Sequence, residues 1–529
     1  MSRPVIIGGG HNGLVCAALL ARAGQRPIVL EARDEVGGCA VTRELAPGFR
    51  VPALTHSVTM RADVVSALEL ESHGLRVIRP GIAAAMTSPD GRLLAIPVDV
   101  DAAARAIAAF SSRDAARWPE FCATARAIVS AVDTLMARIP PSIDEPTAAE
   151  IWDLVQVGRR VRGLGRSRLY QLLRWGPMAI ADLANEWFET PALAVALCAR
   201  GVFGMHAGPR SAGTAAQWLL QIANEGHPAG LIATVAGGPG ALSAALEAAA
   251  TTAGAEIRRS TRVSQIEVDD AGASGVALEN GEQIETRSIV AAVDPRQVFL
   301  RLVDAGRLSP SFRQQVMNYR SNGSLAKINL ALSGLPAVRG IDSTGLPPEQ
   351  ALSGRLLASS HPNEIEQAFD CAKYGKLSDR PLLEVTIPSL LDPGLAPAGQ
   401  HVMSIYVQWA PYRLRDGGWD DLRGTLEQRA LQRLAEIAPD VPSRIIASEV
   451  LTPLDLEREY GLTGGHVFHG EHALDQLYAM RPVLGWAQHR TPIEGLYLCG
   501  AGTHPGGGVT GAPGAHGARV VLKDLRRSR

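Results

Sequence analysis

The fold is decided by residues 4–40, PVIIGGGHNGLVCAALLARAGQRPIVLEARDEVGGCA. An apolar run ending at Ile7 meets glycines in the pattern Gly-x-Gly-x-x-Gly, and helical apolar spacing follows to about Ala23. A second apolar run then ends at Glu31. This order of strand, glycine turn, helix, strand and acid, with the acid about 20 residues beyond the glycines, predicts a dinucleotide-binding unit.

Each residue type in this stretch has a physical task. Gly8 turns the backbone where a Cβ would clash, and Gly10 lets the main chain approach a pyrophosphate. Gly13 allows the helix to pack close to the strand, and the free N–H groups at the helix start hold phosphates. Glu31 accepts hydrogen bonds from ribose hydroxyls. We therefore expect these four residues to bind a dinucleotide.

The composition excludes several classes of function. The 529 residues suffice for two or three domains, and a formal net charge of −1 gives no reason to expect nucleic acid as a partner. The six cysteines form no CxxC motif, which argues for a reducing compartment and against zinc. Because the first strand begins at residue 4 or 5 and no stretch approaches 18 uninterrupted apolar residues, we expect a cytoplasmic protein. Its oligomeric state is not predicted.

The last residues leave a contact with a membrane open. Arg526, Arg527 and Arg529 could touch an anionic surface at the periphery, although a solvated tail is the simpler interpretation.

A second glycine-rich signal closes the chain. A buried strand over Leu496–Cys499 runs into the loop GAGTHPGGGVTGA, residues 500–512, and a small-residue helix is predicted from about Val509 to Leu525. A helix N-terminus there would stabilise phosphate or negative charge on a flavin ring. Two nucleotide loops at opposite ends of the chain favour FAD, which is long enough to need both. Only one complete fingerprint is present, so we do not expect NAD(P)H as a second bound dinucleotide.

These motifs resemble the phytoene desaturase and amine oxidase superfamily of FAD-dependent oxidoreductases. The closer likeness is to the branch named pyridine nucleotide-disulfide oxidoreductase domain-containing protein 2. The stretches that carry it are IIGGGHNGLVCAALLARAG, GGCAVTRELAPGF, GGPGALSAAL, FHGEHALDQLYAMRP and RTPIEGLYLCGAGTHPGGGVTGA. Where the superfamily usually has an arginine after the second glycine pair, this chain has Cys39.

The resemblance implies the fold and the cofactor contacts. It implies an α/β fold with a discontinuous, Rossmann-like FAD-binding domain of the GR2 type, in the segments 1–95, 229–300 and 456–529. The residue pattern itself predicts a helical cap over residues 96–228, because stretches such as 101–110 and 121–137 carry apolar residues at three- and four-residue spacing. It predicts the sheet and helices of an α+β substrate domain over 301–455. The positions where the superfamily contacts FAD are Gly8, Gly10, Asn12, Gly13, Glu31, Arg33, Gly38, Cys39, Ala40, Val263, Gly500, Gly502, His504 and Val509.

Four residues are candidates for catalysis. Lys327 lies in the alternating strand pattern Leu325–Leu332, where an inward-facing lysine would be costly to bury, and it resembles the lysine that amine oxidases place near the flavin. His504 lies in the C-terminal flavin loop, and His56 follows the strand after the second glycine pair. We expect His469, together with Glu471, to line the pocket. For His504 and His56 a structural hydrogen bond is the alternative, and for Lys327 a solvent-facing or paired side chain.

A metal site is not expected. His466, His469 and His472 recur every three residues, but they lie beside glycines in a loop where their side chains need not converge.

The sequence leaves three functions open. The leading one is an FAD-dependent dehydrogenase, desaturase or isomerase that passes a hydride from a small hydrophobic substrate, polyene or lipid-like, to flavin N5. The second is amine oxidase-like C–N oxidation, against which an aromatic content of 5% weighs mildly because such sites use aromatic cages. The third is a regulatory or interaction protein that FAD merely stabilises.

Overall fold

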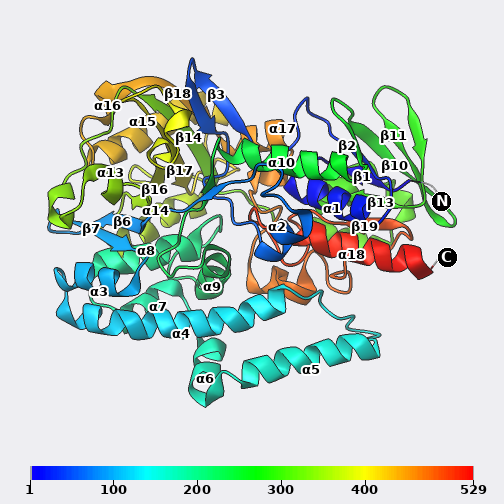
Figure 1. Ribbon diagram of the computed structural model, residues 1–529, viewed down its shortest axis with the longest axis horizontal. Helices are drawn as coiled ribbons and strands as arrows, with labels where there is room; N and C mark the ends of the chain where they lie inside the picture. Colours follow the sequence, from blue (N-terminus) through cyan, green and yellow to red (C-terminus); the bar gives the residue numbers. More distant parts are fainter. Residues whose placement is uncertain (1–2, 528–529) are drawn as a thin grey trace.

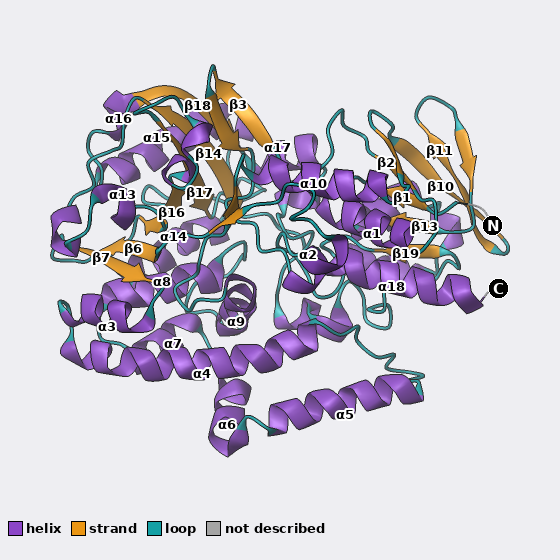
Figure 2. Ribbon diagram, viewed as in Figure 1, coloured by secondary structure: helices purple, strands orange, loops and turns teal. Residues whose placement is uncertain are grey.

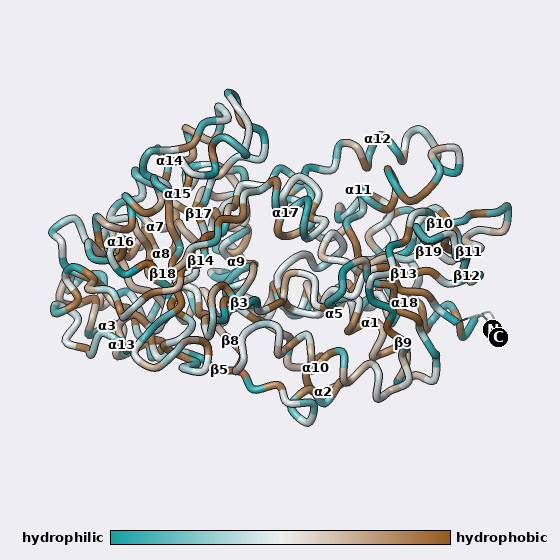
Figure 3. The backbone as a smooth tube through the Cα atoms, turned by 90° about the horizontal axis from the view of Figure 1, so that it is seen from above, coloured by the Kyte–Doolittle hydropathy of each residue, from teal (hydrophilic) through white to brown (hydrophobic). Residues whose placement is uncertain are grey.

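The computed structural model describes residues 3–527 and arranges them in two lobes that lie side by side (Figures 1 and 3). One lobe is built on a five-stranded parallel sheet and the other on a seven-stranded mixed sheet. Both ends of the chain lie in the first lobe (Figure 1). The predicted α/β class with a Rossmann-like sheet is confirmed.

The parallel sheet brings together segments from the beginning, middle and end of the chain. Its order is β19 (Leu496–Leu498), β13 (Ile289–Ala291), β1 (Val5–Ile7), β2 (Ile28–Leu30) and β9 (Glu256–Arg258). The four strands other than β9 are entirely buried and, apart from the Tyr497 hydroxyl, apolar, as expected for parallel strands that are covered on both faces.

Helices cover one face of this sheet and an antiparallel meander covers the other. Ile6 and Val290 belong to the core beneath the helices, whereas Val5 and Ile7 belong to the core beneath the meander. The helices are α1 (His11–Arg22), α10 (Pro239–Thr252) and α18 (Ala512–Arg527), and the meander is β10 (Val263–Asp269), β11 (Gly272–Leu278) and β12 (Gln283–Glu285). Helix α18 begins three residues later than predicted because Gly511 adopts a φ of 71°, outside the helical region.

The second lobe is a mixed sheet with one apolar face. Its order is β18 (Ile445–Leu451), β14 (Leu325–Leu332), β17 (His401–Gln408), β16 (Leu382–Thr386), β15 (Arg355–Leu357), β6 (Ile82–Thr87) and β7 (Leu93–Pro97). Ile328, Val385 and Ile405 point to the face covered by α15 (Trp419–Ala435) and form a core with it. Strand β14 has the predicted bounds.

The first predicted domain boundary differs from this arrangement. Strands β6 and β7 belong to the seven-stranded sheet, although they fall largely within the segment 1–95 that is predicted to belong to the FAD-binding domain. Strand β6 pairs in parallel with β15, which follows much later in the chain. No local pattern in the sequence indicates that two strands so far apart in the chain pair with each other.

The cap is helical, as predicted, and it shares a core with the sheet. Trp118, Phe121 and Trp218 of the cap belong to the same buried cluster as Met86 and Leu357 of β6 and β15. Figure 2 shows the cap helices in the lower half of the view. They are α3 (Val100–Ala108), α4 (Ser112–Met136), α5 (Ala148–Arg162), α6 (Gly165–Trp175), α7 (Ile180–Trp187), α8 (Pro191–Val202) and α9 (Thr214–Glu225). Because the cap and the sheet share this core, they pack as one body.

Candidate functional site

Two cavities meet between the lobes. The larger, of about 650 Å³, follows the glycine turn after β1, the acid after β2 and the start of β10. The smaller, of about 100 Å³, lies between the cap, the seven-stranded sheet and the loop before α2 (Ala62–Leu68). Four residues line both cavities: His11, Cys39, His469 and Ala501. We call the first the dinucleotide cavity and the second the inner cavity.

The glycine turn has the close packing that the fingerprint requires. A Cβ on Gly13 would lie 2.1 Å from the carbonyl oxygen of Gly8, and Gly8 itself has a φ of 97°. The Glu31 carboxylate accepts hydrogen bonds from the Gly9 N–H at 2.7 Å and from the Arg33 N–H at 2.9 Å. These bonds hold the acid beside the turn, at the edge of the dinucleotide cavity.

Unpaired polar atoms at this cavity fit a polar ligand. Asn12 Oδ1, His11 Nε2 and His469 Nδ1 are buried and have no hydrogen-bond partner among the described residues. Buried polar atoms in proteins are rarely left unpaired, so such atoms along a cavity wall suit the phosphates, hydroxyls and ring nitrogens of FAD.

Most of the predicted cofactor residues line a cavity. Cys39 lines both, and Val509 lines the inner one. The dinucleotide cavity is lined by Gly8, Gly10, Asn12, Gly13, Glu31, Arg33, Gly38, Cys39 and Val263.

Ala40, Gly500 and Gly502 line neither cavity. The two glycines flank Ala501, which does. A Cβ on Gly500 would lie 2.5 Å from the Ala292 oxygen, and one on Gly502 would lie 2.4 Å from Pro295 Cδ. Glycine is therefore required at these two positions by packing against the residues that follow β13, whatever the ligand.

The structure does not bring His504 to the site. Its ring is fully buried, stacks on His516 at 5.9 Å and meets the edge of Tyr478 at 5.3 Å. It lines neither cavity, and burial lowers its pKa to about 3. The sequence places His504 in the predicted loop, but its ring packs against His516 and Tyr478 and lines neither cavity.

One face of the seven-stranded sheet carries a row of polar side chains toward the cap. Lys327 pairs directly with Tyr406, and Tyr406 pairs with Glu384. Residues that are directly opposite on paired strands share a face, so the three side chains stand in line. The next row on this face is Asn329, Ser404 and Thr386, in which the Ser404 hydroxyl donates to Asn329 Oδ1 at 2.7 Å.

Lys327 lies against the face of the Tyr406 ring. Its Nζ is 4.3 Å from the ring centroid and has no hydrogen-bond partner among the described residues. Burial lowers the pKa of this amine well below its usual value. Lys327 lines neither cavity, whereas Tyr406 lines the inner one.

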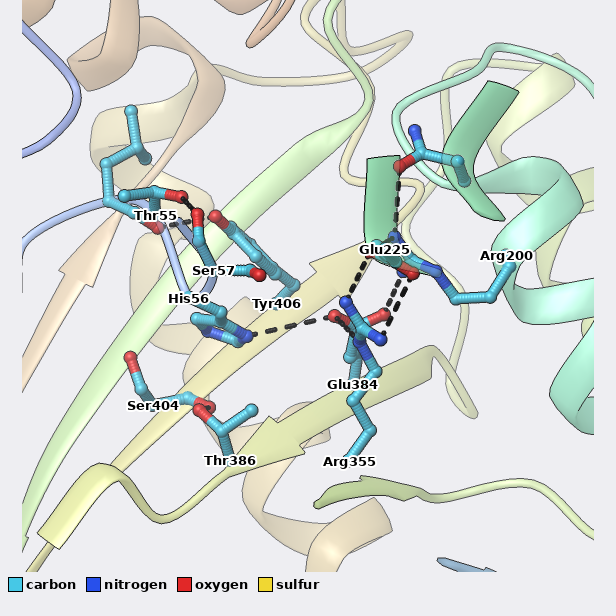
Figure 4. Close-up of polar contacts among 12 residues, drawn as sticks. Thr55, His56, Ser57, Arg200, Glu225, Arg355, Glu384, Thr386, Ser404 and Tyr406 are labelled. Atoms are coloured by element: carbon cyan, nitrogen blue, oxygen red, sulfur yellow. Dashed lines mark hydrogen bonds and ion pairs between the residues drawn. The ribbon is translucent and has the colours of Figure 1, made fainter. Parts of the chain in front are cut away.

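Two arginines and two glutamates form a closed ring of ion pairs at the wall of the inner cavity (Figure 4). Arg200 of α8 contacts Glu225 of α9 at 2.9 Å and Glu384 of β16 at 2.6 Å. Arg355 of β15 contacts the same two glutamates at 2.6 and 2.9 Å. The four side chains are at most 7% exposed. The ring thus joins two cap helices to two strands of the sheet.

The charges of this ring compensate one another. Burial raises the pKa of Glu384, but the neighbouring Arg200 and Arg355 guanidinium groups outweigh burial and hold that pKa well below its usual value. The carboxylate therefore stays ionised, and each charge in the ring has two partners of opposite sign. Such a ring is costly to break because removing one member leaves a buried charge uncompensated.

His56 stands between this ring and the inner cavity. Its imidazole stacks on Tyr406 with 3.9 Å between ring centroids, and its Nδ1 lies 3.8 Å from Glu384 Oε1 (Figure 4). Neither ring nitrogen has a hydrogen-bond partner among the described residues. Burial, assisted by the nearby Lys327, lowers its pKa to about 3, so the ring is neutral at physiological pH.

Three aromatic rings gather at the inner cavity. Phe203 meets Tyr406 at 5.2 Å and Phe468 at 5.9 Å, both at steep angles, and all three residues line the cavity. The low aromatic content of the chain was a poor guide here, because three aromatic residues are enough to form one wall of this cavity.

The histidines near residue 469 separate in space. His469 lines both cavities, and burial lowers its pKa to about 3. His472 bonds to Gln217 at 3.2 Å and stacks on Phe468. Glu471 lines neither cavity, contrary to prediction, because it pairs with Arg320 at 3.0 Å. Within residues 3–527 no three His, Cys, Asp or Glu side chains are grouped to hold a metal ion.

None of the four residues in the ring of ion pairs was predicted as a site residue, although the sequence contains a signal for two of them. Arg200 stands in the otherwise apolar helix PALAVALCARGV, and Glu384 in the strand LLEVT. A charge inside an apolar run requires a buried partner of opposite sign. The sequence does not show which charges pair, because the four residues come from distant segments.

Comparison with known proteins places this geometry in a family. The family model described as flavin containing amine oxidoreductase matches residues 13–516. The chain is 34% identical over 546 residues to the rat pyridine nucleotide-disulfide oxidoreductase domain-containing protein 2, covering 99% of this chain and 93% of the rat protein. It is 29% identical to a limonene dehydrogenase subunit from Castellaniella defragrans, covering 98% and 94%. Cyclohexylamine oxidase from Brevibacterium oxydans has the same fold, with a TM-score of 0.60 at 16% identity, covering 99% of this chain and 100% of the other.

Proposed function

Because the chain belongs to the flavin-containing amine oxidoreductase family and is an FAD-dependent oxidoreductase, we propose that it dehydrogenates a compact, uncharged and mainly hydrophobic substrate in the inner cavity. An isomerisation of the same kind of substrate is the redox-neutral variant of this proposal. The name of one relative, a limonene dehydrogenase subunit, agrees with a substrate of this class.

The charge balance of the inner cavity carries the proposal. The ring of Arg200, Glu225, Arg355 and Glu384 has no net charge, and each of its charges is already paired. His56 is neutral because burial lowers its pKa to about 3. An ionised ligand would lose its hydration and find no free counter-charge on these groups, which is costly in a buried site. An uncharged substrate avoids that cost.

The size of the cavity favours a compact molecule over a long polyene. One water needs roughly 10–15 Å³ of such space. The inner cavity, of about 100 Å³, therefore accommodates roughly seven to ten groups of that size. A monocyclic hydrocarbon or a similar small molecule fits a cavity of this volume.

The chain's own residues provide proton transfer and exclude water. Bound FAD supplies the acceptor for a hydride from a substrate C–H bond. The substrate also loses a proton in a dehydrogenation, and the neutral imidazole of His56 accepts it at a free ring nitrogen. Oε1 of Glu384 lies 3.8 Å from Nδ1 of this imidazole, although its carboxylate is already paired with Arg200 and Arg355. Phe203, Tyr406 and Phe468 contribute apolar surface to the wall, which helps to exclude water.

C–N oxidation is a second candidate, and the aromatic rings favour it. Phe203, Tyr406 and Phe468 offer ring faces of the kind that hold an amine. The amine would have to enter the cavity in its neutral form, since the carboxylates of Glu225 and Glu384 are already paired.

Stopped-flow measurement of flavin reduction tests the role of His56. The variant His56→Phe keeps a ring against Tyr406 but removes the proton acceptor, so we expect reduction to slow by roughly 10²–10⁴-fold. His206→Gln is the matched control, because His206 of the cap packs against Phe369 and lines neither cavity. Reduction of His56→Phe at the rate of the control would exclude His56 as the proton acceptor.

A further inference from the structure

The helices α5 and α6 carry large apolar side chains on the surface. They pack on α4 at the lower edge of the molecule (Figure 1). Trp152 is 56% exposed, Tyr170 56% and Leu173 64%. Ile143, Ile151, Leu154 and Val155, from α5 and the segment before it, are also exposed. Half of the large exposed hydrophobic residues in the described chain lie in this one segment, which we call the α5–α6 hairpin.

The same hairpin concentrates positive charge. The hairpin and the segment before it, residues 143–175, contain four acids, all before residue 154, and six arginines, all after it. The acids are Asp144, Glu145, Glu150 and Asp153, and the arginines are Arg159, Arg160, Arg162, Arg166, Arg168 and Arg174. The whole chain has a net charge of −1, so this excess is local. Within residues 3–527, Arg174 alone among the six has a carboxylate partner, Glu186.

Arginine and aromatic side chains are interleaved on this surface. The Arg159 guanidinium lies 5.4 Å from the centroid of the Trp152 ring, and that of Arg166 lies 5.5 Å from the Tyr170 ring. Each helix has a buried residue on another of its sides, namely Val157 in α5 and Trp175 in α6. Each helix thus has one side on the protein and another of exposed apolar residues bordered by cations.

From this arrangement we infer that the α5–α6 hairpin docks the protein on the surface of an anionic phospholipid bilayer. Exposed Trp, Tyr and Leu enter the boundary between headgroups and acyl chains, while arginines at the border contact lipid phosphates. The positive charge of the hairpin selects an anionic surface over a neutral one. No helix in residues 3–527 is long and apolar enough to cross a bilayer, so the contact is peripheral. It lies on a different part of the chain from the C-terminal arginines, of which Arg529 is outside the described residues.

Vesicle co-sedimentation of the full-length, FAD-loaded protein tests this inference. We expect binding to phosphatidylglycerol vesicles that weakens with salt, and much weaker binding to phosphatidylcholine vesicles. Arg162→Gln combined with Arg168→Gln removes two charges that have no carboxylate partner in the described part of the chain, and should weaken binding to phosphatidylglycerol by roughly 30-fold. Trp152→Ser combined with Leu173→Ser should weaken it by at least roughly tenfold.

Matched surface changes elsewhere serve as controls. Arg313→Gln and Tyr374→Ser alter exposed residues of the same types outside the hairpin and should leave vesicle binding unchanged. Flavin absorbance and circular dichroism of each variant check that it is folded. Failure of the wild type to bind phosphatidylglycerol vesicles would overturn the inference. So would self-association in ultracentrifugation that the Trp152→Ser and Leu173→Ser pair abolishes without any effect on vesicles, because the hairpin would then be an interface between copies of the chain.

Discussion

Replacing Glu384 by glutamine tests whether the buried ring of ion pairs joins the cap to the sheet. The change keeps the shape of the side chain but leaves Arg200 and Arg355 with Glu225 as their single shared counter-charge. Removing one partner of a buried ion pair typically costs about 3–5 kcal/mol. Because the Glu384 side chain is 7% exposed, solvent screens this loss little, and we expect a decrease in the free energy of unfolding near the lower end of that range.

Urea unfolding followed by tryptophan fluorescence measures this change where it acts. The cap core contains Trp118, Trp175, Trp187 and Trp218, so the fluorescence reports on the part that the ring secures. Asp370→Asn is the matched control, since it breaks the exposed pair with Lys373 and should cost less than about 1 kcal/mol.

The pH dependence gives the same prediction an independent check. The pKa of Glu384 is lower in the folded protein than in the unfolded chain, where it is about 4.3. Its ionised form therefore stabilises the fold above that pH, and this contribution is lost as the pH falls toward the folded-state pKa. The difference between wild type and Glu384→Gln should shrink in acid. A cost equal to that of Asp370→Asn at neutral pH would refute the reasoning.

Three further predictions follow from single features of the site. Gly13→Ala should give protein that purifies without FAD, because the new Cβ would lie 2.1 Å from the Gly8 oxygen, whereas Gly158→Ala, with open space around it, should retain the flavin absorbance. Lys327→Met should raise the free energy of unfolding by about 1 kcal/mol or leave it unchanged, since it removes an unpaired buried amine; a clear loss in urea unfolding would reveal a partner. Burial lowers the pKa of His56 and His469 to about 3 each, so the unfolded chain binds more protons below its own histidine pKa. Stability should therefore fall as the pH decreases from about 6.5 toward about 4, and a flat thermal-unfolding profile there would contradict neutral histidines.

The sequence predicted what depends on local pattern. The glycine fingerprint, the strand Leu325–Leu332 and the helical cap each have a spacing that a single segment carries, and the structure contains all three. The order of the motifs also led to the correct cofactor and family, because FAD needs both ends of the chain.

What the sequence did not predict depends on contacts between distant segments. The parallel pairing of β6 with β15 moved the first domain boundary, and it helps to place Arg355 beside Glu384. His504 lies in the predicted loop, but the packing of His516 and Tyr478 against it determines its direction. A single sequence contains no information on side-chain direction in such a loop.

The central claim is that the inner cavity takes an uncharged molecule, and one comparison of substrates tests it most directly. The FAD-loaded protein is mixed without oxygen with limonene or with cyclohexylamine, which both have a six-membered ring and differ in charge at neutral pH. The visible absorption band of the flavin is then followed with time. The paired charges of Arg200, Glu225, Arg355 and Glu384 predict that the hydrocarbon bleaches this band faster than the amine. Bleaching by cyclohexylamine alone would contradict the claim and favour C–N oxidation.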